Sequence, residues 1–355
     1  MSTRWKRRPE GSTWGDFGPD DQLGRLNLLT PERVRRAVQE VREGITFCLS
    51  LPLDYPGGNK LNPRRHPPRL RATVREGRPN YLYPFGRDFP GSIDIVCDDA
   101  ALLHLQYSTQ WDSFAHMGST FDADGDGVPE IVFYNGFRGG EHITIPASHG
   151  VPIVMDGAIP IEGGQQLEGV NAKRLGIERM AETCVQGRGV MIDLFSLFGR
   201  ERKYVGYDEM MRAIAADKVE IETGDMICLY TGFGDVIMEM KGDPDAHMLE
   251  NSCAVLNGRD ERLLKWITDS NLAVLIADNY AVEAFPSRPG IAPCAFSPLH
   301  EHCLFKLGVH LGELFLLGPL ARWLKQHKRT RFLLTAPPLR LPGAVGSPAT
   351  PVATV

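Results

Sequence analysis

The sequence lacks the cysteine patterns that mark several classes of protein. Its 355 residues include seven cysteines, and no two of them form a Cys-x-x-Cys pair. An odd number of scattered cysteines argues against a disulfide framework and against a zinc ribbon. We therefore expect reduced thiols, which favours a cytoplasmic location.

Long apolar runs are also missing. No segment reaches the roughly 20 apolar residues that a membrane helix requires, and the basic start of the chain lacks the apolar core of a secretory signal. Basic residues cluster only at residues 4–8 and 325–331, and the formal net charge is −5. We therefore expect neither a membrane nor a nucleic acid as partner.

Three common nucleotide and nucleophile motifs are absent. The sequence contains no Gly-x-Gly-x-x-Gly turn, no Gly-x-x-x-x-Gly-Lys loop and no Gly-x-Ser-x-Gly elbow. Nucleotide binding and serine-hydrolase chemistry therefore lack their usual support.

Strand-like and helix-like segments alternate in the second half of the chain. Residues 189–194, 225–231 and 272–277 are short apolar runs with β-branched residues, which predicts buried strands. Residues 207–218 and 259–270 have helical spacing. This alternation predicts an α/β fold.

The remaining segments of the chain predict other kinds of structure. Thr30 followed by Pro31 predicts the start of a helix. Residues 55–90 are rich in proline, glycine and arginine, which predicts an irregular lobe, and residues 336–355 predict a C-terminal coil. Residues 131–134 and 143–155 resemble strands. We expect one domain over 1–355, with the N-terminal lobe at about 1–95 wrapping it together with the coil.

The richest cluster of polar residues lies between His104 and His116. In an extended segment Gln106, Ser108, Gln110 and Asp112 would share one face, and a bend after Phe114 would bring His116 to the same point. Alternatively, the segment is a sheet edge whose polar groups cap a loop, and His116 is a surface histidine.

A second cluster contains His300, Glu301, His302, His310 and Glu313. Imidazoles and carboxylates this close favour metal binding or acid–base chemistry. In a helix, however, His302 and His310 would not share a face, so we expect only one or two of these groups to be functional.

Asp122, Asp124 and Asp126 match the first half of a calcium loop. Phe133 occupies the twelfth position, where such a loop has a glutamate. Either calcium binding or a solvated acidic turn fits this pattern.

The first cluster resembles the signature of the putative cyclase family, which includes kynurenine formamidase and isatin hydrolase. The family pattern His-x-Gly-Thr-His-x-Asp-x-Pro-x-His corresponds to residues 106–116, Gln-Tyr-Ser-Thr-Gln-Trp-Asp-Ser-Phe-Ala-His. Further similarity lies at residues 14–32, 187–193, 224–232, 278–284 and 343–348. The resemblance implies a cyclase-like, swivelling β/β/α fold with a mixed sheet or flattened barrel surrounded by helices.

The resemblance also implies a divalent metal, manganese or zinc, but the ligand positions differ. Gln106 and Gln110 replace the two signature histidines, Asp112 is retained, Glu301 aligns with a later histidine and Glu313 with the ligand glutamate. Amides are poor zinc ligands, so an oxygen-rich site for manganese, magnesium or calcium is expected, with His300 or His302 added. The alternative is a metal-free pocket.

By resemblance, His116 is the catalytic acid or base, and Asp112 acts with it. We expect Thr109 and Gln110 to hold a substrate carbonyl and Trp111 and Phe114 to wall the pocket, although core packing fits these two aromatics equally. The expected activity is hydrolysis of an amide, lactam or lactone in a small cyclic or aromatic substrate, by a homodimer or homotetramer. Two alternatives are a metal-independent dehydratase, cyclase or isomerase using His116 and Asp112, and a non-catalytic binding protein.

Overall fold

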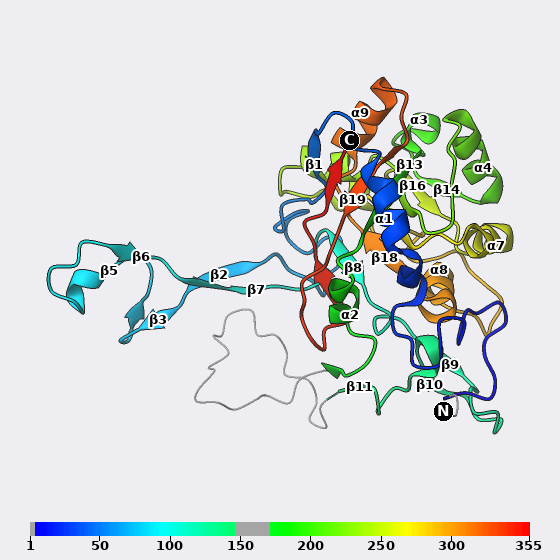
Figure 1. The fold of residues 1–355 in the computed structure, drawn as a ribbon, viewed down its shortest axis with the longest axis horizontal. Coiled ribbons are helices and arrows are strands. Elements are labelled where there is room, and N and C mark those ends of the chain that lie inside the picture. The colour runs from blue at the N-terminus through cyan, green and yellow to red at the C-terminus, as the bar shows by residue number, and fades with distance from the viewer. Residues whose placement is uncertain (1–3, 146–170) are drawn as a thin grey trace.

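A curled mixed sheet of nine strands organises the structure, a computed structural model that describes residues 4–145 and 171–355 (Figure 1). Four neighbouring parallel strands form its centre: β13 (Gln186–Asp193), β15 (Met226–Tyr230), β17 (Val274–Ala277) and β18 (His310–Glu313). Three of them are the apolar runs predicted above. Strands buried on both faces need such continuous apolar sequence.

Five antiparallel strands extend this centre on both sides. The full order is β1-β21-β19-β13-β15-β17-β18-β8-β20. The added strands are β1 (Thr46–Cys48), β21 (Val352–Thr354), β19 (Arg331–Thr335), β8 (Gln110–Asp112) and β20 (Gly346–Pro348). The prediction of a C-terminal coil was therefore wrong, because β20 pairs with β8 and β21 pairs with both β1 and β19.

Helices pack on both faces of the sheet. The α4 and α7 helices contribute Met210 and Leu263 to the core on one face, whereas α2 and α9 contribute Ile177 and Leu320 to the core on the other. The helices are α1 (Pro31–Val38), α2 (Ile177–Glu182), α3 (Phe195–Phe198), α4 (Tyr207–Ala216), α5 (Phe233–Glu239), α6 (Ala246–Asn251), α7 (Glu261–Ser270), α8 (Pro298–His300) and α9 (Gly318–Gln326). The α1 helix starts as predicted, because the Thr30 side chain accepts a hydrogen bond from the Arg33 backbone N–H. No helix of the described residues is long and apolar enough to cross a membrane.

The described residues also form short helical turns. They are η1 (Gly24–Leu28), η2 (Phe85–Arg87), η3 (Tyr134–Gly136) and the π-helical turn η4 (Glu301–Leu307), into which α8 runs directly.

The N-terminal region is not one irregular lobe. Its first part packs on the sheet through α1 and β1, but β2 (Arg69–Ala72) and β7 (Asp99–Leu102) pair in an arm that projects from the body (Figure 1). The arm continues into β3 (Val74–Arg75) with β4 (Arg78–Pro79), and β5 (Tyr83–Pro84) with β6 (Ile95–Val96). The remaining two-stranded sheets pair β9 (Ser119–Phe121) with β10 (Glu130–Val132), β11 (Ile143–Thr144) with β12 (Asn171–Ala172), and β14 (Lys203–Val205) with β16 (Ala254–Leu256). The strand predicted at 143–155 thus begins at β11, and its part beyond residue 145 lies outside the described residues.

Candidate metal and catalytic site

The site begins at the antiparallel pairing of β8 with β18. Gln110 lies opposite Glu313, and Asp112 lies opposite Leu311. Because side chains alternate along a strand, Gln110, Asp112 and Glu313 share one face of the sheet. The Gln110 Nε2 donates to Glu313 Oε2 over 3.2 Å. Two segments about 200 residues apart in sequence therefore meet at one point.

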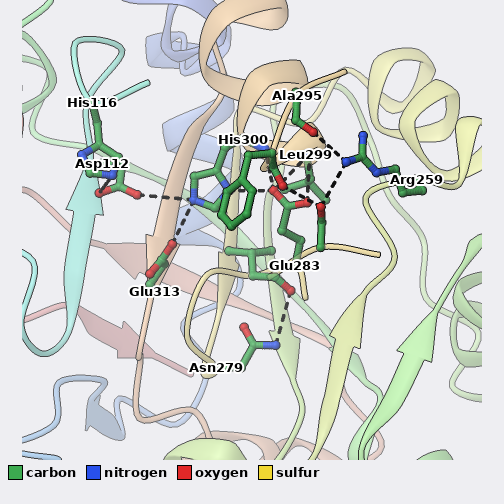
Figure 2. Close-up of polar contacts among 12 residues, drawn as sticks. Asp112, His116, Arg259, Asn279, Glu283, Ala295, Leu299, His300 and Glu313 are labelled. Atoms are coloured by element: carbon green, nitrogen blue, oxygen red, sulfur yellow. Dashed lines mark hydrogen bonds and ion pairs between the residues drawn. The ribbon is translucent and has the colours of Figure 1, made fainter. Parts of the chain in front are cut away.

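His300, at the end of α8, lies between carboxylates on both sides (Figure 2). Its Nε2 is 3.2 Å from Glu313 Oε1 and 3.9 Å from Asp112 Oδ2, and its Nδ1 is 2.9 Å from Glu283 Oε1. A carboxylate only accepts hydrogen bonds, so Nδ1 donates to Glu283. The Nε2 atom is thereby directed toward Asp112 and Glu313.

Asp112 is buried, and no described residue donates a hydrogen bond to it. Both of its side-chain oxygens are inaccessible to solvent and lack a partner in residues 4–145 and 171–355, and the same is true of Gln110 Oε1. His116 follows in the turn after β8, with its Nε2 3.8 Å from Asp112 Oδ1. Unsatisfied buried acceptors of this kind are costly unless a cation or donor completes them.

Burial and hydrogen bonding shift the pKa values of Asp112, Glu313 and His300 in different directions. Burial raises the pKa of Asp112, and the nearby Glu313 adds to this effect although His116 opposes it. Burial also favours the neutral form of Glu313, but the hydrogen bond and the charge of His300, together with the charge of Arg65 and a backbone hydrogen bond from Ala281, outweigh it and lower the pKa of that carboxyl. Burial alone would lower the pKa of His300, whereas its bonds to Glu283 and Glu313 raise it to about 10. Without a bound cation, His300 is thus an imidazolium held by two carboxylates.

A cavity of about 240 Å³ lies beside this cluster of side chains. Gln110, His116, His300 and Glu313 line it, together with Tyr280 from the loop after β17. The Tyr280 hydroxyl accepts a hydrogen bond from Asn62 Nδ2 over 3.0 Å. A small molecule in this cavity would contact both the imidazole of His116 and the carboxylate of Glu313.

The donor set fits a divalent cation. Asp112, His300 and Glu313 each offer a ligand atom, and these atoms lie within 4.8 Å of one another. Two carboxylates and one imidazole suit manganese, zinc or iron. Gln110 lines the same cavity, and its Oε1, which has no hydrogen-bond partner among the described residues, is a further candidate ligand.

Several residues proposed from the sequence lie elsewhere. Residues 105–109 form turns instead of a strand, so Gln106 lines a different pocket and does not join Gln110 and Asp112. His302 faces α7, with its Nε2 2.9 Å from both Thr268 Oγ1 and the Leu264 carbonyl. Glu301 pairs with Lys306 at 3.4 Å. The residue that meets Glu313 is His300, one position before Glu301.

The four residues expected to bind the substrate do not all lie at the cavity. Only Gln110 lines the cavity. Thr109 is buried and donates to the Leu314 carbonyl over 2.6 Å. Trp111 lies on the opposite face of β8, where it packs against Phe315 and donates to the Ala336 carbonyl. Phe114 packs against Tyr134 and His310. For Trp111 and Phe114 the core-packing alternative is therefore correct.

Sequence reasoning missed Glu283 and Tyr280 as members of the site. Glu283 accepts hydrogen bonds from the backbone N–H groups of Leu299 and His300 as well as from the His300 ring. In the sequence, its segment, residues 278–284, shows only similarity to the family. A lone glutamate between turn residues gives no sign that it will be fully buried, so no pattern in the sequence marks its role.

In the predicted calcium loop, the Asp122 carboxylate is bonded to backbone groups of the loop itself. Asp122 accepts hydrogen bonds from the backbone N–H groups of Gly125 and Gly127 and pairs with Arg7 at 2.7 Å. Asp124 and Glu130 offer ligand atoms beside it, whereas Asp126 is outside this group. Calcium binding at Asp122, Asp124 and Asp126 stays a prediction.

Comparisons with known proteins identify the family and the fold. The family model described as Putative cyclase matches residues 70–284, more than half of the chain. A solved structure described as a novel cyclase is 30% identical, with a TM-score of 0.69 over 97% of this chain and 99% of its own. Isatin hydrolase A from Labrenzia aggregata is 12% identical and has a TM-score of 0.52, over 89% of this chain and 94% of its own.

Isatin hydrolase A from Ralstonia solanacearum gives a TM-score of 0.51 at 12% identity, over 90% of this chain and 93% of its own. At this identity the two hydrolases show a shared fold. A comparison with the curated proteins finds no match. The family match and the 30% identical structure confirm the resemblance at residues 106–116 and the cyclase-like α/β fold. The chain belongs to the putative cyclase family.

Proposed function

We propose that this chain is a hydrolase that opens an amide, lactam or lactone bond of a small cyclic or aromatic substrate, assisted by a divalent cation. One observation carries the proposal: within the described part of the chain, both oxygens of buried Asp112 lack a hydrogen-bond partner beside His300 and Glu313, at a cavity lined by His116. A purely structural carboxylate would be expected to have donors. The fold that the chain shares with isatin hydrolases supports the same reaction class.

Asp112, His300 and Glu313 would hold the cation, with Gln110 Oε1 as a further oxygen. A bound divalent cation supplies Lewis-acid activation of a carbonyl oxygen and of water. Manganese is preferred over zinc in this proposal, because two carboxylates and an amide make the site rich in oxygen. Glu283 fixes the His300 ring, since Nδ1 donates to it and Nε2 is left facing the other two ligands.

His116 would move the proton of the reaction. It lines the cavity, and its Nε2 lies 3.8 Å from Asp112 Oδ1, within ion-pair distance of that carboxylate. Imidazole accepts and returns protons near neutral pH, so one side chain can deprotonate water and then protonate the leaving group. Tyr280 and Gln110 would position the substrate in the same cavity.

The His116–Asp112 pair also supports a second candidate, a metal-independent dehydratase, cyclase or isomerase. In the absence of a cation, the protonated His300 ring is held by Glu283 and Glu313, so part of the negative charge of the site is compensated without metal. An acid–base pair is sufficient for proton transfer in such reactions. The two candidates therefore differ in whether activity requires a cation.

The test uses purified, untagged protein with a panel of aryl formamides, lactams and lactones. Under the proposal, chelation abolishes hydrolysis and manganese restores it, and His116→Gln lowers kcat by about 10²- to 10⁴-fold without loss of manganese. His247→Gln is the control, because His247 is exposed on α6. Activity that survives complete chelation would support the second candidate. If no substrate is turned over, the non-catalytic binding protein becomes the better account.

A further inference from the structure

The cavity with His116 and Glu313 is also lined by two adjacent arginines, Arg64 and Arg65. They stand in the segment that leads into the projecting arm, far in sequence from β8 and β18. Neither arginine belongs to the ligand set or to the proton-transfer pair. Their presence therefore needs an explanation of its own.

The turn that carries the two arginines is fixed in place. Asn62, buried at 7% exposure, accepts a hydrogen bond at its Oδ1 from the Arg64 backbone N–H over 3.0 Å and donates to the Tyr280 hydroxyl. The Arg65 backbone N–H donates to the Asn62 carbonyl over 3.0 Å. The arginine pair is thus attached to a residue of the cavity wall.

The Arg65 side chain is held at the wall by neutral partners. Its Nη1 donates to the Gln106 carbonyl over 2.6 Å, and its guanidinium lies 6.0 Å from the centroid of the Tyr280 ring. A guanidinium has five N–H donors in a planar fork, so this arrangement leaves donors for another acceptor.

Neither guanidinium has an anionic partner in the parts of the chain that the structure describes. No carboxylate of residues 4–145 or 171–355 forms a direct ion pair with Arg64 or Arg65, although most other ion pairs of the molecule involve arginine. The carboxylates whose charge acts on Arg65 from a longer distance include Asp112 and Glu313. The carboxylates of Asp112 and Glu313 would be taken up by the cation under the proposed function. Two positive charges then face the cavity without a counter-ion.

We propose that Arg64 and Arg65 form an anion subsite and that the substrate carries a carboxylate group in addition to the bond that is cleaved. Arginine pairs bind carboxylates through charge-assisted and often bidentate hydrogen bonds, which fix the orientation of the molecule. The carboxylate at one wall would place the scissile carbonyl beside Asp112 and His116. The inference rests on the proposed function, because it names the substrate class of the same cavity.

The first test measures binding and needs no turnover. The probes are benzenesulfonate, an anion that ligates metals weakly, and methyl phenyl sulfone, its neutral analogue, titrated calorimetrically into manganese-loaded and chelated protein. Wild-type protein is expected to bind the anion at least about 10-fold more tightly, and Arg64→Gln or Arg65→Gln removes this preference, since hydrogen bonds to charged groups are worth this much. Arg35→Gln, on the exposed face of α1, is the matched control. Equal binding of the two probes, or an unchanged preference in both variants, would overturn the inference.

The second test separates the subsite from the reaction. It compares 4-formamidobenzoate with formanilide, which differ only by the ring carboxylate. The inference predicts a KM at least about 10-fold lower for the acid, and Arg64→Gln raises this KM while kcat and the constants for formanilide stay near wild type. Hydrolysis of both compounds with equal KM overturns the subsite but not the hydrolase. Anion preference that depends on Arg64, without hydrolysis of any substrate, supports the subsite and refutes the hydrolase.

Discussion

Glu283 and His300 are joined twice: Glu283 Oε1 lies 2.9 Å from the ring Nδ1 of His300 and 3.0 Å from its backbone nitrogen. One carboxylate therefore fixes both the position of the chain at the end of α8 and the rotation of the imidazole. A ligand that is held in this way keeps its Nε2 directed at Asp112 and Glu313 even before a cation binds.

Glu283→Gln is expected to weaken manganese binding by about 10- to 100-fold, because removing the partner behind a ligating histidine has effects of this size. Calorimetric titration with manganese measures it. Glu301→Gln is the control, since Glu301 pairs with Lys306 and does not touch the site. Equal affinities of wild type and Glu283→Gln would show that Glu283 does not position the ligand.

Asp112→Asn should abolish manganese binding and yet stabilise the metal-free protein. The wild-type carboxylate is buried and has no donor among the residues that the structure describes, so replacing its charge by an amide is expected to raise the free energy of unfolding by about 1–3 kcal/mol. Denaturant unfolding of chelated protein measures this change. Asp243→Asn, at a side chain that is 96% exposed, should change neither property. A destabilised Asp112→Asn protein that still binds manganese would contradict the assignment.

Gln110→His is expected to shift the site toward zinc. Gln110 already lies beside Glu313, and imidazole is a better zinc ligand than an amide, so zinc affinity should rise by about tenfold or more. Gln106→His is the matched control, because Gln106 lines another pocket and packs against Gly346. Competition with a chromogenic chelator measures both. A larger gain in zinc affinity from Gln106→His than from Gln110→His would show that Gln106, and not Gln110, lies at the metal site.

Sequence patterns predicted those parts of the fold that depend on local rules. The apolar runs of β13, β15 and β17 and the cap at Thr30 are local signals, and the structure contains all four. The strand β20 is different. Its sequence Gly346–Pro348 includes a proline and no alternation, and it is a strand only because β8 offers it a free edge.

The site was predictable by residue type but not by position. Asp112, His116 and Glu313 could be selected because carboxylates and imidazoles suit metal and acid–base chemistry. Whether His300, Glu301 or His302 joins them depends on the direction in which each side chain leaves the α8–η4 junction, a tertiary property. Whether Trp111 lines the pocket or packs in the core could not be predicted for the same reason, since a residue in a strand faces one side of the sheet or the other depending on register.

His310 should make the protein sensitive to acid. It is buried beside Phe114, its Nδ1 has no hydrogen-bond partner in residues 4–145 and 171–355, and burial lowers its pKa from 6.5 to about 3. Between these values the unfolded chain binds a proton that the folded protein does not, so stability falls as pH decreases from about 6.5 toward 3.

His310→Leu removes this proton uptake. The loss of unfolding free energy between pH 7 and pH 5 should therefore be smaller in the variant by about 2 kcal/mol. Denaturant unfolding at both pH values measures the difference, and His247→Leu on exposed α6 serves as control. The same pH dependence in His310→Leu and wild type would show that His310 does not titrate as its burial requires.

The central claim, that Asp112, His300 and Glu313 hold a catalytic divalent cation, is tested most directly by equilibrium dialysis against manganese with elemental analysis. The account predicts one tightly bound ion per chain in the wild type and none retained by Asp112→Asn or Glu313→Gln. Wild-type protein that retains no ion, or variants that retain as much as the wild type, would contradict it.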